Sequence, residues 1–197
     1  MRRVALVLAA MALALLLASG VAWAVNKIGT NGPDTLRGTN GADFLSGRSG
    51  NDILLALAGN DTLLGGPGKD IVNGGTLARP FGGAKNLVGG LGNDAVQGGL
   101  GSDRGVGGEG NDFLFDGDIH PAKDTLFGGE GNDVILVWNH PAGKDVVVCG
   151  SGFDRVSADR TDLLAPDCEK VFVGEGNIDP FFDSIPESFW EGLHPQF

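Results

Sequence analysis

Aspartate and glycine recur along this chain in a fixed order that could bind metal ions. In residues 47–55 (GRSGNDILL), an aspartate follows a glycine-rich turn and precedes a short apolar segment. Carboxylate and turn carbonyl oxygens are the ligands that Ca²⁺ prefers, whereas Zn²⁺ selects cysteine or histidine and Mg²⁺ demands octahedral geometry. The candidate calcium ligands are the aspartates that occupy this place in the repeat: Asp34, Asp43, Asp52, Asp61, Asp70, Asp94, Asp103, Asp112, Asp133 and Asp154. A single such turn would need no ion, because Asp and Gly favour turns anyway, but stacked carboxylates would repel one another without cations.

The elements that must position these aspartates follow from the nine-residue period. Each unit supplies a glycine turn and a three-residue strand whose middle side chain points inward. One unit buries little apolar surface, so we expect the units to stack and to share an interior, as in solenoids. The expected inward residues are Leu36, Leu45, Leu54, Leu63, Val72, Val88, Val96, Leu114, Leu126, Ile135, Val147 and Val156. Gly105 interrupts this series, and we expect weaker packing there.

The repeated units resemble the RTX, or haemolysin-type, calcium-binding family, whose nonapeptide is GGxGxDxUx. The resemblance covers residues 28–156 and implies an all-β fold, a right-handed parallel β-roll over residues 25–156 with two repeats per coil. It also implies several Ca²⁺ ions between neighbouring turns, held by aspartate carboxylates and turn carbonyls. The expected carbonyl donors are the glycines at the fourth position of alternate turns: Gly32, Gly50, Gly68, Gly92, Gly110, Gly131 and Gly152.

In an eighteen-residue coil, alternate turns lie on opposite edges of the roll. The first edge is an unbroken series of aspartates: Asp34, Asp52, Asp70, Asp94, Asp112, Asp133 and Asp154. The second edge begins with Asp43 and Asp61, and Asp103 is also regular. Between them lie the insertion 76–84 and Asn86, which we expect to replace an aspartate. We therefore predict that most of the calcium binds on the first edge.

Two enlarged turns of the second edge, 116–124 and 138–145, share a His-Pro-Ala motif followed by Lys-Asp. We expect Lys123 and Lys144 to fill cation positions in these turns. The histidines of the two motifs, His120 and His140, could instead bind a transition metal, although loop histidines are more often solvated.

The N-terminal segment 1–24 has the pattern of a secretory signal peptide. Arg2 and Arg3 precede the apolar run 4–18, and the small residues Ala22 and Ala24 mark a cleavage site. The alternative is an uncleaved membrane anchor, because residues 4–25 are about long enough to span a bilayer. We favour cleavage and expect a secreted protein that has no membrane association after the segment is removed.

The two cysteines, Cys149 and Cys168, fit an oxidising compartment, and we expect one disulfide between them. A pair of buried thiols is the alternative. Residues 157–171 depart from the repeat and are expected to form a C-terminal cap tied to the roll by this bond. The acidic and aromatic tail, 172–197, could fold back on the roll, stay mobile or contact a partner.

Composition narrows the possible functions. Acidic residues outnumber basic ones 25 to 14, giving a net charge of −11, which disfavours nucleic acid and anionic membranes as partners. No compact set of nucleophile, base and acid stands out, so we expect no catalytic residues. We predict a secreted calcium-binding protein with a structural or adhesive extracellular role, possible partners being cell-surface or matrix components. The alternative is an extracellular hydrolase or a surface-recognition protein that uses the enlarged His-Pro turns.

Overall fold

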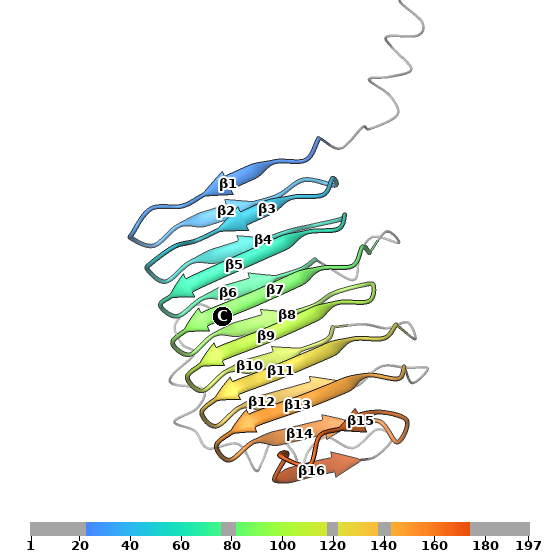
Figure 1. Cartoon of the computed structure of the whole chain (residues 1–197). Coiled ribbons are helices and arrows are strands. Elements are labelled where there is room, and N and C mark those ends of the chain that lie inside the picture. The colour runs from blue at the N-terminus through green and yellow to red at the C-terminus, as the bar shows by residue number, and fades with distance from the viewer. Residues whose placement is uncertain (1–22, 76–81, 118–121, 138–142, 174–197) are drawn as a thin grey trace, which may run out of the picture.

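The computed structural model describes residues 23–75, 82–117, 122–137 and 143–173, which form two parallel β-sheets of eight strands each (Figure 1). Odd-numbered strands form the first sheet, in the order β1 (Asn26–Ile28), β3 (Phe44–Ser46), β5 (Thr62–Pro67), β7 (Asn86–Leu91), β9 (Arg104–Glu109), β11 (Thr125–Glu130), β13 (Val146–Ser151) and β15 (Leu163–Leu164). Even-numbered strands form the second sheet: β2 (Thr35–Arg37), β4 (Ile53–Leu55), β6 (Ile71–Asn73), β8 (Ala95–Gln97), β10 (Phe113–Phe115), β12 (Val134–Val137), β14 (Arg155–Ala158) and β16 (Lys170–Val173).

Successive strands alternate between the two sheets, so one coil contains one strand of each sheet and therefore two nonapeptides (Figure 1). Each strand pairs in parallel with the strand one coil away, as Leu45 does with Leu63 and Leu36 with Leu54. The predicted all-β parallel roll with two repeats per coil is confirmed. Within the described part of the chain, no helix is long and apolar enough to cross a membrane.

The core is a column of middle-strand side chains between the two sheets. The fully buried members include Leu45, Leu54, Leu63, Val72, Leu87, Leu114, Ile135, Val147 and Val156. Leu87 is 0% exposed and pairs with Leu63, whereas Val88 pairs with Leu64 on the outer face. The expectation that Val88 points inward is therefore wrong, and the inward residue is Leu87. A shift of one residue along a strand moves each side chain to the opposite face of the sheet.

Gly105 lies in the core column of the first sheet, where it pairs with Leu87 and Leu126. A Cβ atom on Gly105 would lie 2.8 Å from Cδ2 of Leu126. The larger neighbour thus fills part of the space that the missing side chain leaves, and the two sheets stay continuous through this coil.

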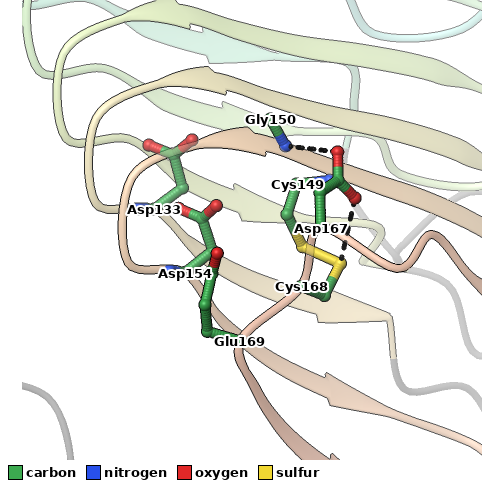
Figure 2. Close-up of a disulfide and its surroundings, with 7 residues drawn as sticks. All are labelled: Asp133, Cys149, Gly150, Asp154, Asp167, Cys168 and Glu169. Atoms are coloured by element: carbon green, nitrogen blue, oxygen red, sulfur yellow. Dashed lines mark hydrogen bonds between the residues drawn. A yellow bond between two sulfur atoms is a disulfide. The ribbon is translucent and has the colours of Figure 1, made fainter.

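The C-terminal end of the roll is closed by β15 and β16, which pair with β13 and β14 respectively. The predicted disulfide is confirmed: Cys149 and Cys168 are joined with a Cα–Cα distance of 5.2 Å. Asp167 accepts a hydrogen bond from the Gly150 backbone N–H over 3.1 Å, beside the disulfide (Figure 2). The expected signal segment lies outside the described residues except for its last two positions, as does the tail from residue 174 onward.

Candidate metal centre

The first edge of the roll consists of the turns that lead from an odd strand to the following even strand. Each turn ends in an aspartate, and the backbone N–H of every one of these aspartates except the last donates to Oδ1 of the aspartate one coil further on. Asp34 donates to Asp52, and Asp94 donates to Asp112, both over 2.8 Å. The complete order of this first-edge ladder is Asp34, Asp52, Asp70, Asp94, Asp112, Asp133 and Asp154. These hydrogen bonds fix one oxygen of each acceptor carboxylate, from Asp52 to Asp154, and leave the other oxygen for a different partner.

The cap ends this ladder with a different acid. The backbone N–H of Asp154 donates to Glu169 Oε2 over 2.9 Å. Figure 2 shows the side chains of Asp133, Asp154 and Glu169 following one another in successive coils. Sequence reasoning missed Glu169, because it lies in the segment that departs from the repeat.

The second carboxylate oxygen, Oδ2, is buried without a hydrogen-bond partner in many of these turns. Within the described residues this applies on the first edge to Asp52, Asp70, Asp94, Asp112, Asp133 and Asp154, and on the second edge to Asp61 and Asp124. A buried polar atom without a partner is costly, and buried carboxylates are normally paired with a cation. A row of such oxygens therefore points to cations as their partners.

Main-chain carbonyl oxygens approach the same places. A Cβ atom on Gly89 would lie 2.5 Å from Asp94 Oδ2 and 2.7 Å from the Gly107 carbonyl oxygen of the next coil. The same pairing of a carboxylate and a carbonyl oxygen recurs on the first edge at Gly29, Gly47, Gly65, Gly89, Gly107 and Gly128. Only a residue without a side chain leaves this space open. The space is lined by hard oxygen donors, which fit Ca²⁺.

Burial changes the acidity of the ladder carboxyls. Loss of water raises the pKa of Asp94 to about 7 and that of Asp112 to about 8, and backbone N–H donation offsets only part of this effect. On the second edge, burial raises the pKa of Asp124 to about 8. Neighbouring aspartates raise these pKa values further. The carboxylates need a positive partner in order to stay ionised at neutral pH.

A different group of possible ligands, Cys149, Asp167 and Cys168, lies together at the cap. Its two sulfur atoms form the disulfide, so neither is a thiolate that could bind a metal.

The family model for RTX calcium-binding nonapeptide repeats matches this chain in four copies, at residues 28–63, 47–76, 81–114 and 122–137, together about half of its length. The chain belongs to the RTX calcium-binding repeat family. No curated protein and no solved structure matches it. The RTX resemblance seen in the sequence is thereby confirmed, and the chain is a calcium-binding repeat protein at the level that this family describes.

The second edge of the RTX roll, where even strands lead to odd strands, has a ladder of its own. Its members are Asp43, Asp61, Lys85, Asp103, Asp124, Asp145 and Asp162. Sequence reasoning assigned no ladder role to Asp124, Asp145 and Asp162. A usable signal was present, because Asp124 directly precedes the strand triplet Thr-Leu-Phe just as Asp43 precedes Phe-Leu-Ser. The enlarged turns before Asp124 and Asp145 hid this register.

The lysine and asparagine assignments on the second edge need correction. Asn86 is the first residue of β7 and pairs with Thr62, so the ladder position belongs to Lys85. Lys123 and Lys144 have exposed side chains and do not fill cation positions. His120 and His140, the other candidates in the enlarged turns, lie outside the described residues.

The two edges differ at the position equivalent to Gly89. On the first edge this position is glycine in every coil except the last repeat, where Cys149 occupies it. On the second edge several coils carry a side chain there: Ala56, Asp116, Val137 and Ala158. This difference supports the prediction that calcium favours the first edge, which stays a prediction.

The fourth-position glycines stack directly on one another along the first edge. Gly50, Gly68, Gly92, Gly110, Gly131 and Gly152 have φ values between 122° and 149°. At each of them a Cβ atom would clash with the main chain of the equivalent glycine one coil earlier. The role of their carbonyl oxygens, and of that of Gly32, as calcium ligands stays a prediction.

Proposed function

We propose that this protein is a secreted calcium-binding RTX protein with a structural or adhesive role outside the cell, and that Ca²⁺ drives its folding. The observation that carries the proposal is the row of buried Oδ2 atoms on the first edge, each fixed in place by its partner Oδ1 and left without a hydrogen-bond partner among the described residues. Calcium bound there would neutralise stacked carboxylates and join adjacent coils.

The ligands in this proposal are the aspartates of the first-edge ladder together with main-chain carbonyls of the glycine turns. On the second edge, Asp43, Asp61 and Asp103 are the corresponding candidates. The bound ions supply positive charge and coordination, and no chemical step is required of them. The protein would therefore act through its folded shape and its surface, without catalysis of its own.

The secreted location rests on two observations. The sequence of residues 1–24 has a signal-peptide pattern, and the described roll contains a disulfide, a bond typical of oxidising compartments. Extracellular calcium modules bind at about 10⁻⁴–10⁻³ M. A roll tuned to this range would stay loosely ordered inside the cell and fold in the calcium-rich medium.

A calcium titration tests the coupling of metal binding to folding. The chain from residue 25 onward is stripped of metal, and its circular dichroism is recorded as Ca²⁺ is added. We expect the β signal and the thermal midpoint to rise together, with half of the change at about 10⁻⁴–10⁻³ M Ca²⁺. An unchanged spectrum and midpoint would show that the roll is stable by itself and would refute the coupling.

Expression of the full chain tests the location. We expect the protein in the culture medium or at the cell surface, with Val25 as its first residue in N-terminal sequencing. A surface-adhesive role further requires that a calcium chelator releases the surface-bound fraction. Recovery of the protein only from inside the cells would refute secretion.

A further inference from the structure

A lysine is buried in the second edge at a place where the other coils of the ladder carry an aspartate. The backbone N–H of Lys85 donates to Asp103 Oδ1 over 2.8 Å, as a ladder aspartate would. Its side chain is only 1% exposed, and its ammonium nitrogen Nζ lies 3.2 Å from the Gly59 carbonyl oxygen and 3.1 Å from that of Gly83. Asp61 Oδ2 is 3.9 Å from the same Nζ. The ammonium is thus surrounded by carbonyl and carboxylate oxygens, the two donor types that Ca²⁺ takes.

The path of the lysine side chain shows how it fits between the coils. A Cβ atom on Gly74 would lie 2.7 Å from Lys85 Cδ, whereas the equivalent atom on Gly89 would lie 2.5 Å from Asp94 Oδ2. The lysine stem therefore lies where the carboxylate lies in a regular coil. From there the ammonium reaches back to the preceding coil, which contributes Gly59 and the buried Asp61 carboxylate.

We propose that the Lys85 ammonium takes the place of one calcium ion, so that the joint between the coil of Asp61 and the coil of Lys85 is held without metal. The proposal rests on the proposed function, because it assumes that the other joints of the ladders bind Ca²⁺. It divides the second edge into two calcium-binding stretches, one before and one after this joint. The protein should accordingly bind fewer ions than its number of coil-to-coil joints.

Three variants of the full chain, freed of its signal segment, separate this role from simple packing. Lys85→Asp restores the residue type of the regular ladder and removes the ammonium. Lys85→Met keeps an apolar stem of similar length but no charge. Lys123→Met is the matched control, because Lys123 is next to the ladder residue Asp124 in the chain but has an exposed side chain.

Calcium binding is counted by equilibrium dialysis, and folding is followed by circular dichroism over the same range of Ca²⁺ concentration. We expect Lys85→Asp to bind one more ion per chain than the wild type. We expect Lys85→Met to bind the same number as the wild type, but to need several times more calcium for half-maximal folding. Lys123→Met should match the wild type in both measurements.

The proposal is overturned if folded Lys85→Asp binds no additional ion, or if Lys85→Met folds at the same calcium concentration as Lys123→Met. Failure of the proposed function gives a different result, because the wild type would then bind no calcium at all. In that case the thermal midpoint without metal still tests Lys85. A midpoint that is lower for Lys85→Met than for Lys123→Met supports the ammonium as the cation of this joint, and equal midpoints contradict it.

Discussion

From Asp52 to Asp133, the aspartates of the first-edge ladder use their two carboxylate oxygens differently. Oδ1 accepts the backbone N–H of the preceding coil and so sets the position of the side chain, while Oδ2 lies buried beside a carbonyl oxygen of the next coil. The hydrogen bond occupies only Oδ1 and leaves Oδ2 available to an ion. It also holds the other oxygen in place before an ion arrives, which reduces the ordering cost of binding.

Substitutions on the two edges should differ in their effect on calcium binding. We expect Asp112→Ala to weaken calcium binding at its site about tenfold or more, equivalent to about 1.4 kcal/mol, and Asp124→Ala to weaken it less. Asp112 lies beside the open space at Gly107, whereas Asp116 fills the equivalent place in the coil of Asp124. Calorimetric titration of both variants measures the difference. An equal loss in the two variants would contradict a preference for the first edge.

The metal-free protein should lose stability as the pH rises. Burial raises the pKa of Asp70, Asp94 and Asp133 to about 7 and that of Asp112 to about 8. A carboxyl whose pKa is raised in the folded state stabilises the fold fully below its unfolded pKa of about 4, and this contribution is lost as the pH passes the folded value. We therefore expect the thermal midpoint of dialysed, metal-free protein to decrease as the pH is raised from about 4 to about 8.

The same melting series with saturating calcium is the control for this pH effect. Calcium binds the ionised form, so the fall between pH 6 and pH 8 should disappear or reverse. If the thermal midpoint of the metal-free protein instead rises between pH 6 and pH 8, ionisation of the buried carboxyls does not destabilise the fold.

At the scale of the turns, the stacked glycines set the distance between coils. Gly92 has a φ of 122°, and a Cβ atom there would clash with the Gly68 carbonyl oxygen. Gly32, in the first turn, is different, because a Cβ atom placed there would lie no nearer than 4.0 Å to its closest neighbour, Thr30 Oγ1. Among the residues that the structure describes, no earlier coil of the ladder lies next to the first turn, so Gly32 has room that the later glycines lack.

Alanine at these two positions should therefore act very differently. We expect Gly92→Ala to lower the free energy of unfolding by about 2 kcal/mol or more, through left-handed strain and the clash with the neighbouring turn. Gly32→Ala should change it by less than about 1 kcal/mol. Denaturant unfolding at saturating calcium checks both. Equal stability of the two variants would contradict the close stacking.

The regular elements were predictable from the sequence, whereas the register across insertions was not. Where units follow one another without a gap, glycine, aspartate and the apolar residue keep fixed spacing, so Leu45, Leu54 and Leu63 were assigned correctly to the core. After the insertion 76–84, the sequence pattern placed Asn86 at the position that an aspartate takes in regular repeats, because its side-chain amide resembles a carboxylate. The correct register puts lysine at that position, which the pattern of the repeat does not allow for.

At the scale of the whole roll, each described strand pairs only with strands of the neighbouring coils, so stability is distributed along the axis of the roll. The disulfide between Cys149 and Cys168 ties the last coil to the cap, where β15 and β16 have few partners. On the chain-entropy model, closing a loop of this length contributes about 3 kcal/mol. The effect should be concentrated at one end, because a coil far from the cap does not contact it.

Reduction of the disulfide should therefore loosen the C-terminal end of the roll and leave the N-terminal coils intact. We expect hydrogen exchange in saturating calcium to become faster for β14, β15 and β16 after reduction, with no change for β3, β4 and β5. Oxidised protein under the same conditions is the control. Uniformly faster exchange along the whole chain would show that the roll unfolds as one cooperative unit.

The direction of the first-edge hydrogen bonds sets the order in which the coils of the roll can form. Every first-edge ladder N–H donates toward the C-terminus, to a carboxylate that lies 15 to 24 residues later in the chain. A chain that emerges N-terminus first from a pore into a calcium-rich medium presents each donor before its acceptor has appeared. Each coil can therefore complete its ladder hydrogen bond only after the next coil has emerged. The last first-edge donor, the Asp154 N–H, finds its acceptor only when Glu169 has followed.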